Sequence, residues 1–349
     1  MKPPMLTSDF DYHLPPDMIA QTPMEPRDYS RLLTLDRVSG QVGHRRFFDL
    51  PDLLNAGDLL VFNDSRVFPA RLNGRGEPSG REIELLLLTR IREGTWRTLV
   101  RPGRRMRTGA QFTVSDEGRG RAVRGKVLEV EEAGTRIVSF VDESALREIG
   151  VIPLPPYIHE SLEDPERYQT VYSDREGSAA APTAGLHFTD GLLDRLDDMG
   201  VEKAFVTLHV GWDSFRPVKS ESADEHEMHS EYWEMSATSA DAINSAKREG
   251  RRVISVGTTA VRLLENAAIL GDGADSLLKE GSGWVDLFIT PGFEFRVIDG
   301  LITNFHLPRS TLLMLVSAFA GRESVFSAYR TAVESGYRFY SFGDAMLII

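Results

Sequence analysis

Residues 252–268 read RVISVGTTAVRLLENAA, and this stretch decides the kind of fold that the chain adopts. Arg252–Val256 is a short apolar run that predicts a strand, and Thr259–Ala268 has the apolar spacing of a helix. Gly257-Thr258-Thr259 separates the two and supplies the small and capping residues of a turn. A strand followed directly by a helix is typical of folds that pair their strands in parallel.

The same alternation recurs in the rest of the chain outside residues 71–150. Predicted strands are Asp58–Phe62, Val201–Val210 and Leu301–Phe305. Predicted helices are the segment capped by Thr189-Asp190 that runs through Met199, and Thr238–Glu249, Ser310–Ala320 and Glu323–Ser335. Strands that alternate with amphipathic helices predict an α/β (mixed α+β) main body with parallel pairing.

Residues 71–150 have a different pattern. Short runs rich in Val, Ile, Leu, Thr and Phe follow one another between glycines: Ile83–Arg90, Thr95–Arg101, Ala110–Val114, Arg121–Glu129 and Thr135–Val141. Strands at such short intervals predict a small barrel or sandwich. We therefore predict an α/β catalytic body made of residues 1–70 and 151–349, split by an inserted β-barrel-like domain at 71–150.

Composition excludes several classes of protein. The chain has 349 residues, of which 41% are hydrophobic and 9% aromatic, too many for an intrinsically disordered protein. Cysteine is absent, which excludes disulfides, thiolate zinc sites, iron–sulfur clusters and a Cys nucleophile. The first residues lack the apolar stretch of a signal peptide, and Thr311–Ala320 is too short to span a membrane. We expect a cytoplasmic protein.

The charge is unevenly distributed. The chain has 40 Lys+Arg and 52 Asp+Glu, and its net charge of −12 taken alone disfavours a nucleic-acid partner. Residues 66–126, however, hold 15 basic and 6 acidic residues, a local charge of +9, which leaves −21 for the other residues. Most of the basic residues are Arg, which suits phosphate contact and base stacking. The segment fits a polyanion-binding face, and a solvated Arg-rich surface accounts for it equally well.

Familiar sequence fingerprints are absent. The chain has no G-x-G-x-x-G, no P-loop, no H-E-x-x-H and no G-x-S-x-G. The nearest histidine cluster is His226-Glu227-Met228-His229, which lacks a third ligand, so no metal is expected.

Polar residues instead gather where predicted strands end. These clusters are Asn63-Asp64-Ser65-Arg66, Thr207-Leu208-His209, Gly257-Thr258-Thr259 with Arg262, and Asn304-Phe305-His306. In open α/β sheets, ligands bind outside the carboxyl ends of strands, where helix N-termini favour anions. Each cluster alone is explained by a cap or a turn, but together they predict a polar small-molecule pocket. The loop Pro182–Phe188, with Thr183, Gly185 and His187, is a further candidate because its small residues allow a ligand to approach the backbone.

Several long strings in this order resemble one family. They are VFNDSRVFPARL (61–72), PLPPYI (153–158), AAPTAGLHFT (180–189), VTLHVGWDSFRPV (206–218), HEMHSE (226–231), VGTTAVRLLE (256–265) and LITNFHLPRSTLLMLVSAFAG (301–321), with YRFYSFGDAMLI (337–348) at the end. The family is the S-adenosylmethionine:tRNA ribosyltransferase-isomerases of queuosine biosynthesis. The resemblance covers nearly the whole chain except the β segment and residues 269–281. Trp212-Asp213-Ser214 departs from the family's pattern.

The resemblance implies a reaction. The enzyme would transfer the ribosyl portion of S-adenosylmethionine, a co-substrate rather than a recycled cofactor, to 7-aminomethyl-7-deazaguanine at the wobble position of tRNA. Isomerisation would give epoxyqueuosine-tRNA, with release of adenine and methionine. The partners would be S-adenosylmethionine and the anticodon region of tRNA, and we expect a monomer. The alternatives are an S-adenosylmethionine hydrolase that acts without RNA and a noncatalytic RNA-binding module.

This chemistry needs a base to remove a ribose C5′ proton, which the sulfonium acidifies, and an acid to assist the departure of adenine. Histidine suits both tasks near neutral pH. His187, His209 and His306 are the candidates, with base and acid unassigned. A purely structural histidine is the alternative at each position.

Other residues are expected to bind the substrates. Thr258-Thr259 and Arg262 are candidates for the methionine carboxylate, Asn63 and Asp64 for the ribose hydroxyls, and Glu231 for the guanine-like edge of the base. The remaining pocket candidates are Ser65, Arg66, Thr183, Gly185, Thr207, Gly257 and Asn304. The residues expected to meet tRNA phosphates, besides Arg66, are Arg71, Arg101, Arg104, Arg105 and Arg107.

Overall fold

The computed structural model describes residues 5–116, 120–131, 134–211, 218, 220–226, 228, 230–271 and 277–349. The chain forms two compact units. The sheet unit consists of Met1–Arg66, Pro156–Arg175 and Ala181–Ile349, and the barrel unit of Val67–Pro155 and Glu176–Ala180. Trp212-Asp213-Ser214 and His229 lie outside the described residues.

The sheet unit is built on nine strands in the order β15-β13-β12-β3-β14-β16-β17-β1-β2. The neighbours β12, β3, β14 and β16 run parallel, and β1 runs parallel to β17, whereas the other neighbouring pairs are antiparallel. The strands are β1 (Arg31–Leu35), β2 (Val42–Arg46), β3 (Leu59–Asn63), β12 (Glu202–Leu208), β13 (Glu231–Met235), β14 (Val253–Val256), β15 (Gly281–Val285), β16 (Gly300–Asn304) and β17 (Ala345–Ile348).

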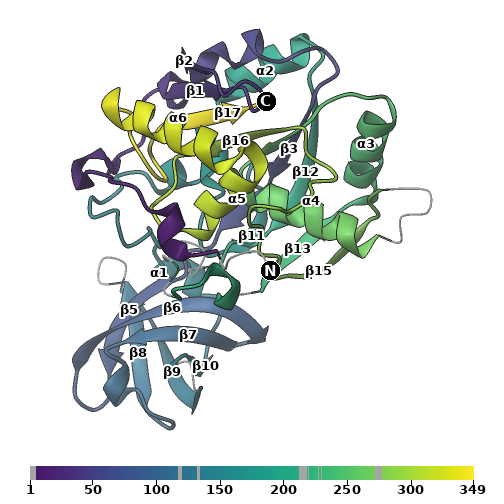
Figure 1. Cartoon of the computed structure of the whole chain (residues 1–349). Helices are drawn as coiled ribbons and strands as arrows, with labels where there is room; N and C mark the ends of the chain where they lie inside the picture. The colour runs from purple at the N-terminus through teal and green to yellow at the C-terminus, as the bar shows by residue number, and fades with distance from the viewer. Residues whose placement is uncertain are drawn as a thin grey trace. The chain divides into compact units, whose positions relative to one another are not determined.

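Helices follow the central strands (Figure 1). They are α2 (Asp190–Asp198), α3 (Ala237–Arg248), α4 (Thr258–Leu270), α5 (Thr311–Ala320) and α6 (Arg322–Glu334). Local sequence sets where three of them begin, because the hydroxyls of Thr189, Ser236 and Ser310 accept the N–H of the residue three positions on. Short 3₁₀ helices include η4 (Phe47–Asp52) and η7 (Thr183–His187).

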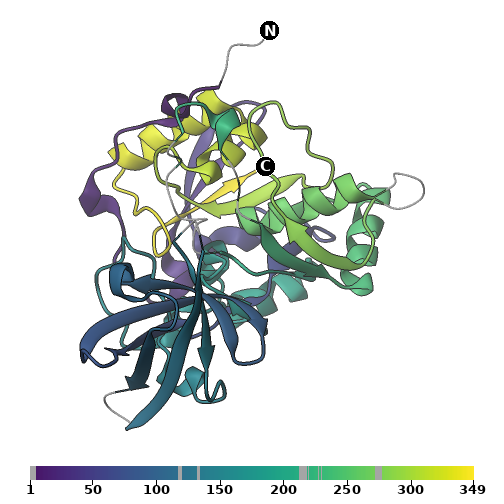
Figure 2. The same cartoon turned by 90° about the horizontal axis from the view of Figure 1, so that it is seen from below.

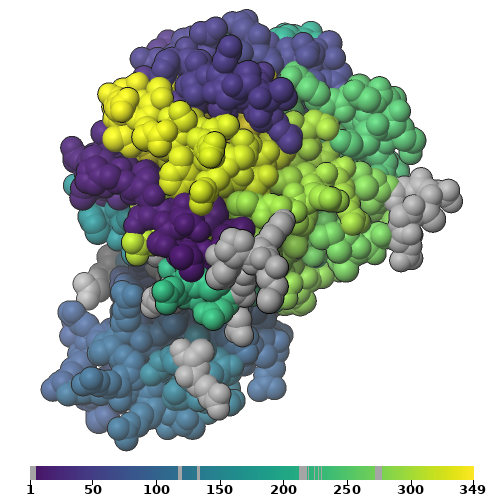
Figure 3. All heavy atoms as spheres, in the orientation of Figure 1, coloured from purple at the N-terminus to yellow at the C-terminus, as the bar shows by residue number. Residues whose placement is uncertain are grey.

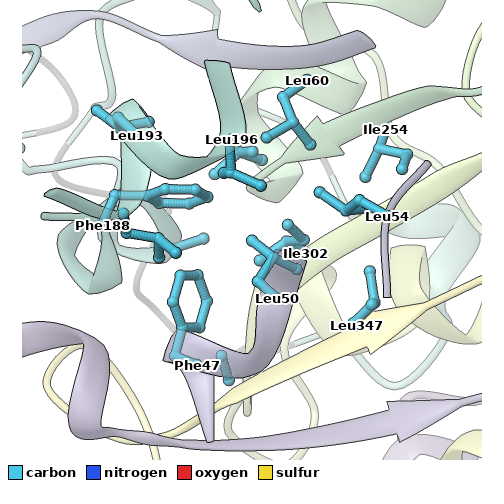
Figure 4. Close-up of a cluster of buried hydrophobic side chains, with 14 of the residues drawn as sticks. Phe47, Leu50, Leu54, Leu60, Phe188, Leu193, Leu196, Ile254, Ile302 and Leu347 are labelled. Carbon is cyan, nitrogen blue, oxygen red and sulfur yellow. The ribbon is translucent and has the colours of Figure 1, made fainter. Parts of the chain in front are cut away.

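One face of the sheet packs on α2, η4 and η7 in a cluster of buried aliphatic and aromatic side chains (Figure 4). Strands β3 and β16 are buried along their whole length, which is why they are continuous apolar runs in the sequence. On the surface, α5 and α6 (yellow) lie beside the N-terminal segment (purple; Figure 3), and Arg309 Nε donates to Asp11 at 2.9 Å.

The barrel unit closes six strands in the order β10-β7-β6-β5-β8-β9 (Figure 2). They are β5 (Arg71–Gly76), β6 (Arg81–Arg92), β7 (Thr95–Arg101), β8 (Gln111–Asp116), β9 (Arg121–Val130) and β10 (Arg136–Phe140), with the one-turn helix α1 (Leu146–Ile149). Phe112 fills the interior against Gly125, where any larger residue would meet its ring. A two-stranded pairing of β4 (Ser65–Val67) with β11 (Arg175–Ser178) completes the strands.

The predicted fold class, an α/β body with a small β barrel, is confirmed. Parallel pairing holds among β12, β3, β14 and β16 and between β1 and β17, but not for the other neighbouring strands. The sequence patterns did not predict β1, β2, β13, β15 or β17. In the part of the chain that the structure describes, no helix is long and apolar enough to cross a membrane.

Candidate active site

A cavity lies at the carboxyl ends of the parallel strands β14 and β16, where α4 and α5 begin. Its unfilled space, including open solvent at the mouth, is about 680 Å³. It is lined mostly by apolar and hydroxyl groups: Tyr157, Ala181, Pro182, Thr183, Ala184, Val210, Met228, Gly257, Thr258, Thr259, Arg262, Thr303, Asn304, Phe305, His306, Thr311, Leu312, Tyr340 and Ser341. The predicted clusters after β14 and β16 therefore meet in one place.

The first turn of α4 forms one wall. Gly257 has a φ of 92°, a left-handed conformation that lets the chain turn directly from β14 into the helix. Its own N–H donates to the carbonyl of Ile302 at 2.8 Å, which ties the turn to β16. The helix start brings Thr258 and Thr259 to the cavity with the positive end of the helix dipole, an arrangement that favours an anionic group.

His306 is the one of the three candidate histidines that lines the cavity. Its Nε2 lies 2.8 Å from the hydroxyl of Thr303, and its backbone N–H donates to the Tyr329 hydroxyl at 3.0 Å. Burial lowers the pKa of His306 to about 3. The imidazole is therefore neutral near pH 7, and can accept a proton but has none to give as an imidazolium.

His187 is buried behind the cavity wall, stacked on Phe47. Asn304 Nδ2 donates to the carbonyl of Tyr340 at 3.1 Å and lies 3.1 Å from His187 Nε2, so this ring nitrogen accepts. The ring proton is then on Nδ1, 2.7 Å from the hydroxyl of Ser30. Burial lowers the pKa of His187 to about 3. Both nitrogens are engaged, so the ring orients Asn304 instead of facing the cavity.

Asn304 connects the buried His187 to residues that line the cavity. Its Oδ1 lies 3.3 Å from the hydroxyl of Thr183, and its Nδ2 holds the carbonyl of Tyr340. Tyr340 has a φ of 76°, which costs about 1–2 kcal/mol for a residue of this size. Next to it, the hydroxyls of Ser341 and Tyr157 are 2.6 Å apart. Sequence reasoning did not single out Tyr157, Tyr340 or Ser341, although the family strings at 153–158 and 337–348 contain them.

Arg262 and Glu231 form an ion pair, each side chain nearly inaccessible to solvent. Arg262 Nε also donates to the carbonyl of Leu287 at 3.0 Å, and Glu231 Oε1 accepts the N–H of Gly211 at 2.7 Å. Only Arg262 reaches the cavity wall. The two residues were predicted to bind separate parts of the substrates, and the structure instead engages each with the other.

The residues of the predicted cluster after β3 lie in different environments. Asn63 is buried, its Oδ1 accepting the N–H of Leu208 at 3.0 Å and its Nδ2 donating to the Leu208 carbonyl at 2.9 Å, so it joins β3 to β12. Asp64 accepts from the Thr207 hydroxyl at 2.7 Å, and both line a second cavity beside α3. Burial raises the pKa of Asp64.

Four other candidates lie outside the first cavity. Ser65 is buried, Arg66 pairs with Glu166, and Gly185 lies under the ring of Tyr172. His209 is half-buried and stacks on Tyr232, and burial lowers its pKa.

In the barrel unit, ion pairs engage several of the arginines. Arg90, Arg97 and Arg121 pair with glutamates, and Arg71 Nη2 donates to the carbonyl of Leu154 at 3.1 Å. Arg101, Arg104, Arg105 and Arg107 are exposed. Within the described ranges, these four side chains form no ion pair.

The chain belongs to the queuosine biosynthesis protein family, whose model matches residues 7–348.

Individual relatives are similar over their full length. The S-adenosylmethionine:tRNA ribosyltransferase-isomerase of Moorella thermoacetica is 56% identical, over 99% of this chain and 100% of the relative. That of Desulfitobacterium hafniense is 53% identical with the same coverage. A crystal structure of the S-adenosylmethionine tRNA ribosyltransferase from Thermotoga maritima is 40% identical and covers 98% of this chain and 100% of that chain, with a TM-score of 0.57. The family resemblance of the sequence strings is thereby confirmed.

Proposed function

We propose that this protein transfers the ribosyl portion of S-adenosylmethionine to tRNA and isomerises it, as the names of its relatives describe. The acceptor is 7-aminomethyl-7-deazaguanine at the wobble position in the anticodon region, and the product is epoxyqueuosine-tRNA. Adenine and methionine leave. The protein acts as a cytoplasmic monomer, with residues 1–70 and 151–349 as its catalytic body and 71–150 as its inserted domain.

The observation that carries the proposal is the cavity between the first turns of α4 and α5. S-adenosylmethionine has a carboxylate, a ribose and a sulfonium. The carboxylate fits the start of α4, where Thr258 and Thr259 add hydroxyls to the free N–H groups of the helix. The hydroxyls of Thr183 and Ser341, which also line the cavity, suit the ribose.

His306 is our choice for the base. It lines the cavity, and its imidazole is unprotonated near pH 7, the form that a base for the C5′ proton must have. In this scheme Nε2 carries the ring proton and donates it to the Thr303 hydroxyl, 2.8 Å away, and the lone pair of Nδ1 acts as the base. His187 has a different role in this scheme: through Asn304 it sets the position of Thr183.

The exposed arginines at 101–107 support contact with the tRNA backbone. They belong to the barrel unit and are not consumed by ion pairs among the described residues. Phosphate contacts position an RNA without reading its sequence, which suits an enzyme whose target base is fixed by its place in the anticodon.

The experiment is mass spectrometry of tRNA after incubation with S-adenosylmethionine and the protein. A mass gain on the 7-aminomethyl-7-deazaguanine nucleoside, with adenine released in equal amount, supports the proposal. Adenine release at the same rate without tRNA indicates the hydrolase, and tRNA binding with neither product indicates the binding module.

A further inference from the structure

A row of aromatic side chains crosses the edge of the nine-stranded sheet. His209 follows β12, Tyr232 lies on β13 and Trp284 on the edge strand β15. The N–H of His209 donates to the carbonyl of Tyr232 at 2.9 Å, and Tyr232 is the register partner of Trp284. The three side chains, which we call the aromatic row, therefore lie side by side on one face of the sheet.

The rings contact one another, and the row is half-buried at His209 and Tyr232 and exposed at Trp284. The His209 and Tyr232 centroids are 6.1 Å apart with planes 17° apart, and those of Tyr232 and Trp284 are 5.6 Å apart at 71°. Trp284 is 59% exposed, whereas the alternating residues Trp233 and Val285 point to the opposite face and are buried. An ordered row of rings that ends in an exposed indole is a surface on which a planar group can stack.

The second cavity adjoins this row through the next register pair, Thr207 with Glu234. Its lining combines the carboxylates of Asp64 and Glu234 with the cations of Arg175 and Lys203. Such a mixture suits a ligand that has both N–H donors and a negative charge. An apolar protein or a lipid surface would instead bury these charged groups without partners.

We propose that the aromatic row and the adjoining cavity bind an unpaired nucleotide of the tRNA substrate, an inference that rests on the proposed function. The base stacks on Trp284, and its N–H groups donate to Glu234 on the neighbouring strand. Its phosphate lies toward Arg175 and Lys203. Unpaired RNA bases are commonly bound by aromatic side chains on the surface of a sheet, because every base offers a flat face.

The test measures binding of an anticodon stem–loop RNA that carries the 7-aminomethyl-7-deazaguanine base, without S-adenosylmethionine. Loss of one stacked base weakens binding about 5- to 160-fold, and we expect this for Trp284→Ala. Trp284→Phe keeps a ring and recovers most of the affinity. Leu270→Ala is the matched control, because Leu270 is a 65% exposed apolar residue of the same unit outside the row. It binds as the wild type does.

Two further readouts separate stacking from other effects. The slope of affinity against salt concentration stays the same in Trp284→Ala, because a stacking contact releases no counterions. Trp284→Ala binding within twofold of the wild type overturns the inference. So does a wild-type dimer that Trp284→Ala dissociates, since the row would then join two copies of the chain. Failure of the proposed function looks different: the wild type itself neither modifies nor binds the RNA.

Discussion

Removal of the Glu231 carboxylate is expected to destabilise the protein severely. In Glu231→Ala, Arg262 stays buried with the Leu287 carbonyl as an acceptor but without its counter-charge, and the Gly211 N–H loses its acceptor. Breaking a buried ion pair in this way costs about 3–5 kcal/mol. This is a large part of the ~5–15 kcal/mol by which proteins of ordinary stability are folded.

Urea unfolding followed by circular dichroism measures this loss. The matched control is Glu234→Ala on the same strand, whose exposed side chain predicts a change of less than about 0.5 kcal/mol. Replacing both partners, as Glu231→Leu with Arg262→Met, removes the unpaired charge and recovers more than half of the loss. A loss below about 1 kcal/mol in Glu231→Ala, with activity abolished, would show that Glu231 serves the substrate and refute our interpretation of the pair.

Three other predictions concern the cavity and the barrel. His306→Gln abolishes at least about 99% of adenine release. Burial lowers the pKa of His306 in the folded state to about 3, so between pH 6.5 and 5 only the unfolded state takes up the proton. The wild type therefore loses about 2 kcal/mol of folding stability over this range because of His306, and His306→Gln does not. If the variant lost the same stability on acidification, His306 would not be the buried, neutral histidine that we describe. Gly257→Ala places a side chain on a backbone with a φ of 92°, which costs about 1–2 kcal/mol. The resulting shift of the first turn of α4 raises the KM for S-adenosylmethionine. An unchanged KM would exclude the start of α4 from the site. Charge reversal of the arginines within Arg104–Arg107 weakens tRNA binding. It also lowers the slope of log affinity against log salt concentration by ~0.9 or less for each phosphate that is no longer neutralised. Arg97→Gln, at an arginine paired with Glu131, changes neither quantity, and equal slopes in the wild type and the charge-reversal variant would place the RNA elsewhere.

The order of strands and helices could be predicted because it depends on local features. The apolar run before Gly257 and the hydroxyls of Thr189 and Ser310 mark element boundaries within a few residues along the chain. Strands β1, β2, β13, β15 and β17 were missed, because each is only four or five residues long. The local pattern is too short there to distinguish a strand from a loop.

The sequence by itself determined the family, the α/β body with its barrel, and the set of polar residues from which a site is built. Only the tertiary structure decided which of them act together. The structure places His306 at the cavity and His187 behind its wall, although the sequence made both histidines candidates. It also pairs Arg262 with Glu231. The physical reason is that burial and ion pairing depend on partners far away in the sequence, such as Ser30 for His187. A local pattern shows that a side chain is polar but not which distant group satisfies it.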